Sequence, residues 1–178
     1  MRHRFTAKQS VPWPIEVVFA FFAQPENLPR IMPAWQQARI EDALYAAPPP
    51  NPQQKAFAAG VGSRMAISFR PFPYAPFRLK WKARITGFEW NRSFCDEQET
   101  GPFAYWRHCH HLHCGSAEAP GNVTQISDEV EYALPLGPLG NIANELFVER
   151  QMRATFAYRH RATLEWLERL IPGSKTAL

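Results

Sequence analysis

Segment 124–132, Thr-Gln-Ile-Ser-Asp-Glu-Val-Glu-Tyr, alternates between apolar and polar residues, and a long helical segment follows it closely. Side chains alternate across a strand, so one face of this segment carries Ile126, Asp128, Val130 and Tyr132. The opposite face is wholly polar and suits solvent, which turns Asp128 toward the interior. A buried carboxylate without a partner is costly. The partners of Asp128, or a ligand beside it, are therefore the most direct indication of function.

The remaining pattern predicts one strand, two short helices, about six strands and one long helix. The first strand covers about 4–11, and the prolines after it open a helix, because proline is well tolerated in a first helical turn. Apolar residues recur there with a helical period, at Ile15, Val18, Phe19 and Phe22. A second short helix lies around 28–32. The final helix, of about 30 residues, runs to Ile171 and ends at Pro172-Gly173.

The clearest strand spans about 77–85. Its apolar face carries Phe77, Leu79, Trp81, Ala83 and Ile85, and its other face carries Arg78, Lys80, Lys82 and Arg84. Such a basic row can contact a phosphate backbone or form the solvated face of a sheet. The aromatic residues that nucleic-acid binding favours do not interleave with these charges. We therefore expect a solvated face and no nucleic-acid partner.

Consecutive strands with tight turns predict a meandering antiparallel sheet with one solvent-exposed face and one apolar face. The long helix then covers the apolar face, and a curved sheet around a helix leaves a hollow that suits small apolar ligands. Four prolines in 47–54 predict an extended loop, which is either a surface connection or a rim segment of a binding site. We expect a single α+β domain over 1–178, a length that buries about 70% of the unfolded surface.

Hydrophobic residues make up 46% of the chain and charged residues 20%, which is typical of a soluble globular protein. The net charge of +4 is short of that of a dedicated nucleic-acid-binding domain. Three cysteines (Cys95, Cys109 and Cys114) are an odd number without zinc-type spacing, which argues against a disulfide framework. The sequence shows neither a signal-peptide pattern nor a membrane span of about 18 apolar residues. We therefore expect a cytoplasmic location.

Polar side chains interrupt the apolar faces of two further strands. In 93–99 one face carries Phe94, Asp96 and Gln98, and in 104–114 one face carries Trp106, His108, His110, Leu112 and Cys114. Trp106 and Leu112 indicate that the second face is buried. The polar side chains that would then meet on three neighbouring strands are Asp96, Gln98, His108, His110 and Asp128.

Carboxylates beside imidazoles leave three roles open. They can form a structural network in which buried polar groups satisfy one another. They can orient a hydroxyl or carbonyl group of an apolar ligand, or they can serve acid–base chemistry or hold a metal. His-x-His with a nearby Asp can ligate zinc, but no cluster of Cys and His reinforces this spacing. We therefore predict neither a metal nor a cofactor.

The long helix carries charges in the middle of its apolar stripe. Steps of three and four from Ile142 reach Leu146, Glu149, Arg153, Phe156, His160, Leu164, Leu167 and Ile171. Glu149 and Arg153 have the spacing of an ion pair on a half-exposed helix. Alternatively, Arg153 reaches over the hollow toward Asp128 or toward an anionic group of a ligand.

Three groups of motifs extend over nearly the whole chain. They are Pro14–Phe19 with Pro25–Leu28, Gly101–Phe103 with Trp106–His110, and Asp128–Tyr132 leading into Pro135–Gly140. Together they resemble the START/Bet v 1-like superfamily, also called SRPBCC or polyketide cyclase-like, in its bacterial ligand-binding branch. The resemblance implies a helix-grip fold, in which a seven-stranded antiparallel sheet wraps around a C-terminal helix and a cavity for lipids, polyketides or other apolar molecules. Members include lipid carriers, quinone-binding proteins, cyclases and hormone receptors, so the fold does not decide the function.

We predict a protein that binds or transports an apolar small molecule, such as a lipid, a quinone or an aromatic metabolite. The predicted cavity walls are Trp81, Phe94, Trp106, Tyr132 and Phe156. The predicted polar contacts are Asp96, Gln98, His108, His110, Asp128 and Arg153. One alternative is an aromatic polyketide cyclase or dehydratase in which His108 or His110 is the general base and Asp128 orients it. The other is a structural module whose cavity is filled by side chains.

Overall fold

The computed structural model describes residues 1–53, 56–115, 122–135 and 147–171. The strands in this part of the chain are β1 (His3–Val11), β2 (Arg39–Leu44), β3 (Arg64–Phe69), β4 (Leu79–Glu89), β5 (Ser93–Thr100), β6 (Tyr105–Cys114) and β7 (Thr124–Ala133). The helices are α1 (Ile15–Phe22), α2 (Leu28–Ile31) and α4 (Glu149–Leu170), with 3-10 turns at Pro25–Asn27 and Ala34–Gln36.

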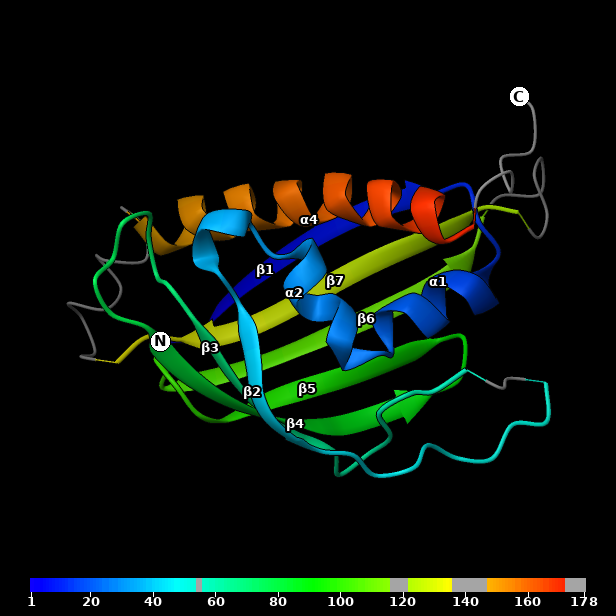
Figure 1. Cartoon of the computed structure of the whole chain (residues 1–178), viewed down its shortest axis with the longest axis horizontal. Coiled ribbons are helices and arrows are strands. Elements are labelled where there is room, and N and C mark those ends of the chain that lie inside the picture. The colour runs from blue at the N-terminus through cyan, green and yellow to red at the C-terminus, as the bar shows by residue number, and fades with distance from the viewer. Residues whose placement is uncertain (54–55, 116–121, 136–146, 172–178) are drawn as a thin grey trace.

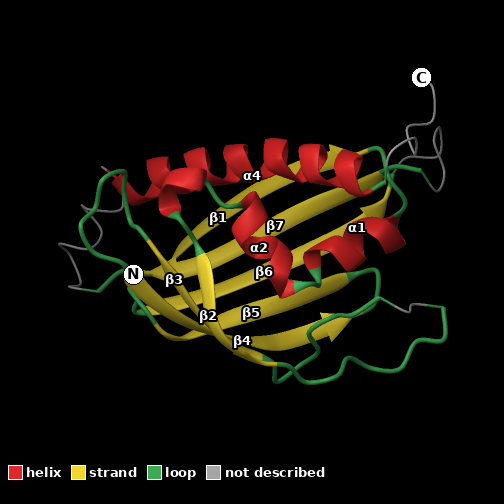
Figure 2. Ribbon diagram, viewed as in Figure 1, coloured by secondary structure: helices red, strands yellow, loops and turns green. Residues whose placement is uncertain are grey.

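The strands form one antiparallel sheet in the order β1-β7-β6-β5-β4-β3-β2. Strands β2 to β7 form a meander, and β1 joins it at the β7 edge, where His3 lies opposite Tyr132. The sheet curves around a helical layer in which α4 runs along the inner face and α1 and α2 lie beside it (Figures 1 and 2). This arrangement confirms the predicted α+β helix-grip architecture with two short helices after the first strand.

Helix α1 fills one end of the space between the sheet and α4. It begins after Pro14, whose carbonyl accepts the Val18 N–H at 3.1 Å, and it buries Val18 and Phe19 completely. The ring of Phe19 packs edge-on against Phe88 and Phe94. The same core cluster includes Leu167 near the end of α4. The apolar residues that recur with the helical period on α1 therefore form a packed core at this end of the helical layer.

Strand β4 has the two faces that its alternation predicts. Ala83 and Ile85 are buried on the inner face, and Lys80 and Lys82 are exposed on the outer face. Phe77, however, precedes the strand and is 51% exposed, so its predicted place on the apolar face is wrong. The alternation applies only within the strand, which begins at Leu79.

The inward face of helix α4 shares Phe156 and Leu167 with the predicted stripe but differs from it at other positions. Its buried residues are Met152, Phe156, Ala162, Thr163 and Leu167. Of the predicted stripe, Leu164 is 37% exposed and the Arg153 side chain is 69% exposed. The inner face is thus rotated by about one position from the stripe drawn from Ile142. The part of the predicted helix at 142–146 lies outside the described residues.

Cys95 and Cys109 form a disulfide bond, which corrects the expectation that the cysteines form no disulfide framework. The two residues lie directly opposite each other on β5 and β6, with Cα atoms 4.1 Å apart. The third cysteine, Cys114, is free and exposed. Sequence spacing missed the pair because cross-strand register brings together two residues that are 14 positions apart.

The proline-rich stretch that begins at Ala47 contains no strand among its described residues. Its Pro49 carbonyl accepts the indole N–H of Trp90 at 2.6 Å, and none of its described residues lines either of the two cavities described below. It is therefore a surface connection. Among the described helices, none is both long and apolar enough to cross a membrane.

Candidate functional site

A cavity of about 330 Å³ lies between the inner face of the sheet and the first half of α4. Its walls are mostly apolar, and their large members are Trp81, Phe103, Trp106, Met152 and Phe156. Trp106 packs edge-on against Trp81, with ring centroids 4.9 Å apart, and tilts against Phe103 at the same centroid distance. These rings come from different elements, so the curved sheet and its loops build one aromatic wall. Such a wall suits a flat or apolar ligand.

A second cavity, of about 80 Å³, lies beside the first on the side of α1. The two share the lining residues Leu28, Met65, Asp96, His108 and Arg159. Phe94 and His110 line the smaller cavity, where their rings stack with centroids 4.4 Å apart. The titratable residues Asp96, His108 and Arg159 thus stand at the boundary between the two spaces, and we call this boundary the polar end of the larger cavity.

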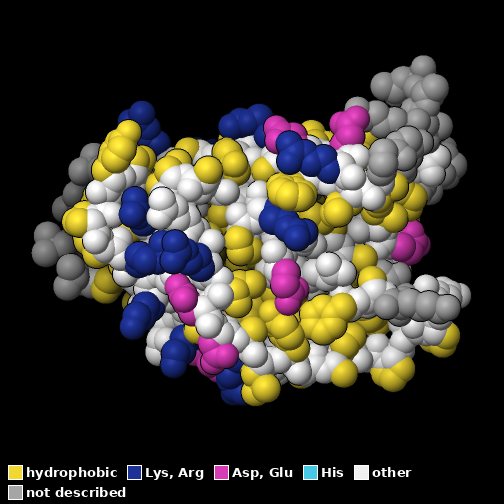
Figure 3. Space-filling view, in the orientation of Figure 1, with side chains coloured by type: hydrophobic (Ala, Val, Ile, Leu, Met, Phe, Trp, Pro, Cys, Tyr) yellow, Lys and Arg dark blue, Asp and Glu magenta, His cyan; other side chains and the backbone are white. Residues whose placement is uncertain are grey.

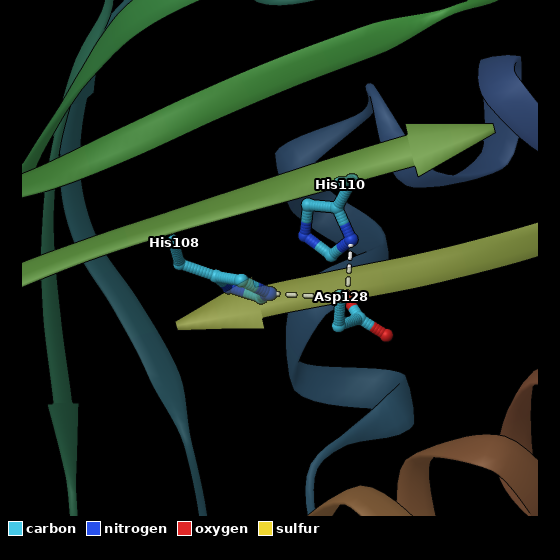
Figure 4. Close-up of side chains that lie close together, drawn as sticks. All are labelled: His108, His110 and Asp128. Atoms are coloured by element: carbon cyan, nitrogen blue, oxygen red, sulfur yellow. Dashed lines mark hydrogen bonds and ion pairs between the residues drawn. The ribbon is translucent and has the colours of Figure 1, made fainter. Parts of the chain in front are cut away.

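Three neighbouring strands bring the polar side chains together. The strand register sets Asp96 opposite His108 and sets His110 opposite Asp128, and directly opposed side chains contact each other. His108 Nε2 is hydrogen-bonded to Asp128 Oδ1 at 3.0 Å, and His110 Nδ1 lies 2.7 Å from the same oxygen. Both rings point from β6 toward the carboxylate on β7 (Figure 4).

The three residues are deeply buried, each 4% exposed. No histidine is seen among the coloured side chains on the face of the molecule in Figure 3. Burial by itself raises the pKa of Asp128, but the adjacent His110 and the hydrogen bond with His108 outweigh it and hold the pKa well below its usual range. Burial lowers the pKa of His108 and of His110, and Asp128 offsets this only in part. Near neutral pH, Asp128 is therefore the anion, and neutral imidazole N–H groups face it.

Asp96 is the carboxylate that reaches the larger cavity. Burial raises its pKa, against the opposing charges of His108 and Arg159 and a hydrogen bond with Trp106. Its Oδ1 lies 3.8 Å from His108 Nδ1. His108 thus stands between two carboxylates, with Nε2 toward Asp128 and Nδ1 toward Asp96. At 3.8 Å the contact with Asp96 is longer than a hydrogen bond, so of the two carboxylates only Asp128 is hydrogen-bonded to His108.

The structure divides the predicted site residues among the larger cavity, the smaller cavity and positions outside both. Trp81, Trp106, Phe156, Asp96 and His108 line the larger cavity, and Phe94 and His110 line the smaller one. Asp128 points inward, as predicted, but lies behind the two imidazoles. Tyr132 is 1% exposed and packs in the cluster around Phe5 and Val130 instead.

Two predicted polar contacts lie away from the cavities. Gln98 donates its side-chain N–H to the carbonyl of Phe103 at 2.7 Å, and so holds the β5–β6 turn. Arg153 is bound to Glu149 at 2.6 Å on the exposed side of α4. The i, i+4 pair is therefore formed, and the alternative in which Arg153 reaches over the hollow toward Asp128 is wrong.

Arg159 is the site residue that the sequence reading missed. It lines both cavities and lies one helical turn after Phe156, with its guanidinium 5.0 Å from the centroid of that ring. Burial lowers its pKa, against the effect of Asp128 and Asp96, and an arginine stays charged under such shifts. The spacing of Met152, Phe156 and Arg159 was the available signal, because steps of four and three keep residues on one helix face.

The donor atoms of His108, His110 and Asp128 lie within 4.8 Å of one another, which is close enough for a metal ion. Arg159 places a positive charge beside these donors, and this charge adds to the burial that lowers the pKa of His110. This charge opposes a bound cation. The cluster therefore fits a hydrogen-bonded network better than a metal site.

Residues 11–157 match the family described as polyketide cyclase / dehydrase and lipid transport. The chain belongs to this family. The family description covers both catalysis and transport, so membership does not decide between them. None of the curated proteins matches the chain.

Several solved structures share the fold of this chain at low sequence identity. The Zhui aromatase/cyclase from Streptomyces sp. R1128 is 13% identical, with a TM-score of 0.68, over 99% of this chain and 100% of that one. A START superfamily protein from Mycobacterium smegmatis is 12% identical, with a TM-score of 0.62, over 95% and 99%. Norcoclaurine synthase from Thalictrum flavum is 13% identical, with a TM-score of 0.62, over 94% and 87%. At these identities the likeness concerns the fold alone.

Proposed function

We propose that this protein binds an apolar small molecule, of the size of an aromatic metabolite, a quinone or a short lipid, in the cavity beneath α4. The observation that carries the proposal is an aromatic-walled space of about 330 Å³ that has Asp96, His108 and Arg159 at one end. A void of this size lined by apolar side chains lacks packing contacts that a ligand would supply. Ligand pockets commonly combine such walls with a few oriented polar groups.

A specific feature favours a second candidate, a cyclase or dehydratase of the same family. His108 is hydrogen-bonded to Asp128 and turns its other nitrogen toward Asp96 at the cavity wall. An imidazole oriented by a buried carboxylate is a common general base. In this role, His108 would remove a proton from a ligand carbon or hydroxyl, and Asp128 would hold the ring in place.

The test is to purify the protein under native conditions and identify any bound molecule by native mass spectrometry and solvent extraction. A hydrophobic fluorescent probe, displaced by the extracted molecule, measures affinity. Trp106→Ala removes part of the cavity wall and should weaken binding about tenfold or more, since buried aromatic anchors dominate binding energy. Trp166→Ala changes the same residue type on α4, away from both cavities, and should retain wild-type affinity.

The outcomes separate the candidates. An apolar molecule that copurifies and is recovered unchanged after incubation supports binding or transport. Recovery of a cyclised or dehydrated product from the incubated complex would support the enzyme instead. If no probe enters the protein, and Trp106→Ala behaves like Trp166→Ala, the cavity does not bind ligands and the proposal fails.

A further inference from the structure

Arg159 is a partly buried arginine whose charge is desolvated by its surroundings, and it forms no ion pair with the described residues. No carboxylate in that part of the chain comes within ion-pair distance of its guanidinium, and its recorded contact is with the face of Phe156. The nearby anion Asp128 is already engaged by His108 and His110. A desolvated charge is costly unless it is paired and hydrogen-bonded. The five N–H donors of Arg159 are thus left for a group that enters the cavity.

The position of Arg159 makes it the cationic group of the site. Among the described lining residues of both cavities it is the only Lys or Arg. The aromatic wall of Trp81, Phe103 and Trp106 lines the same space as Arg159. A ligand that lays an apolar body on these rings can therefore place its polar end at the guanidinium.

Asp96, which lines the same boundary, does not exclude an anionic ligand. Burial raises its pKa, so the carboxyl group takes up a proton more readily than an exposed one. In its protonated form it donates a hydrogen bond to a second oxygen of the same ligand group. His108 and His110 are held neutral by burial and add no competing charge.

We propose that the natural ligand is an apolar molecule bearing a carboxylate, and that Arg159 binds this carboxylate at the polar end of the cavity. This inference rests on the proposed binding function and names the ligand class. Guanidinium and carboxylate form two parallel N–H···O bonds, a geometry that a lysine does not reproduce. The carboxylate can belong to an aromatic acid or to a fatty acid, and the test distinguishes these sources.

The test measures binding of two matched pairs of probes by isothermal titration calorimetry. The aromatic pair is 2-naphthoate and 2-naphthamide, and the aliphatic pair is decanoate and decanamide. Each amide keeps the shape of its acid but carries no charge. We expect the protein to prefer at least one acid over its amide by about tenfold or more, the range of hydrogen bonds to charged groups. The pair with the larger preference identifies the source.

Three variants test whether the preference for the acid over its amide depends on Arg159. Arg159→Met keeps the length and apolar stem of the side chain and should abolish the preference while amide binding changes by less than about threefold. Arg159→Lys should retain only part of it. Arg161→Met changes an exposed arginine on the same helix and should leave the preference intact.

Failure of the inference differs from failure of the proposed function. If acids and amides bind equally well, or if Arg159→Met keeps the preference, Arg159 does not recognise a carboxylate although the cavity still binds apolar molecules. If none of the four probes binds and no hydrophobic dye enters, the binding function itself is contradicted.

Discussion

Asp128 organises the polar end of the cavity although it lines neither of the two cavities itself. Its Oδ1 holds His108 Nε2 at 3.0 Å and lies 2.7 Å from His110 Nδ1. Each imidazole then presents its remaining ring atoms toward a cavity. The buried carboxylate therefore positions the two imidazoles, which line the cavities together with Asp96.

The two buried imidazoles give a testable dependence of stability on pH. Their pKa values are lowered in the folded protein from 6.5, so below about pH 6.5 the unfolded chain binds protons that the folded chain does not. The free energy of unfolding is therefore lost as pH falls, by up to about 1.4 kcal/mol per pH unit for each histidine. Asp96, with its raised pKa, acts in the opposite direction.

A comparison of variants isolates the contribution of His110. Urea unfolding at pH 5.5, 6.5 and 7.5 should show a shallower pH dependence for His110→Gln than for the wild type, with Asp96 present in both. His113→Gln removes an exposed imidazole from the same strand and should keep the wild-type dependence. Equal slopes for wild type and His110→Gln would show that this imidazole titrates alike in the folded and unfolded chain.

At the scale of elements, β5 and β6 are joined both by their hydrogen-bonded ladder and by the Cys95–Cys109 disulfide. The bridge lies between the pairs that build the site, since Cys95 adjoins Asp96 and Cys109 separates His108 from His110. It therefore holds the register on which the polar cluster depends. Disulfides are typical of oxidising compartments, whereas a cytoplasmic location remains the prediction from the sequence.

Reduction of the bridge should lower stability by up to about 3 kcal/mol, the entropy of closing a loop of about 15 residues in the unfolded chain. Denaturant unfolding with and without dithiothreitol measures this loss, and Cys95→Ser should reproduce it without reductant. Cys114→Ser, at the exposed cysteine, should leave the unfolding curve and its response to dithiothreitol unchanged. A wild-type protein insensitive to dithiothreitol, with free thiols at all three cysteines, would contradict the bridge.

Considered as a whole, the molecule divides the space between sheet and helix into a packed end and a hollow end. Around α1, the fully buried side chains of Val18, Phe19, Leu112 and Leu167 form a continuous core. Toward the first half of α4 the same space is the cavity. Stability and ligand binding therefore depend on different parts of one layer.

Two aromatic truncations should separate these roles. Phe19→Ala removes a ring that is 0% exposed and should lower the free energy of unfolding by about 3–5 kcal/mol. Trp81→Ala opens a wall that already borders a void, so it should cost less stability but weaken probe binding more than Phe19→Ala does. Thermal unfolding and probe titration of both variants measure this. Equal stability losses would show that the cavity wall is packed as tightly as the core.

The sequence alone determined the order of elements, the two faces of β4 and β7, and the inward direction of Asp128. It also placed Asp96, His108 and His110 on the same side of the sheet. These features follow from the period of two in a strand, which is a local property of the backbone. The sequence motifs also indicated the family and its helix-grip fold.

Only the tertiary structure decided which face of α4 meets the cavity, and therefore that Arg159 and not Arg153 lies in the site. It also decided the pairing of Cys95 with Cys109 and the place of Tyr132 in a packed cluster. A helix with charges on several sides has no unique inward face until it packs on a sheet, and cross-strand partners depend on a register set by the whole meander. Both depend on contacts between residues that are distant in sequence, which a local period does not specify.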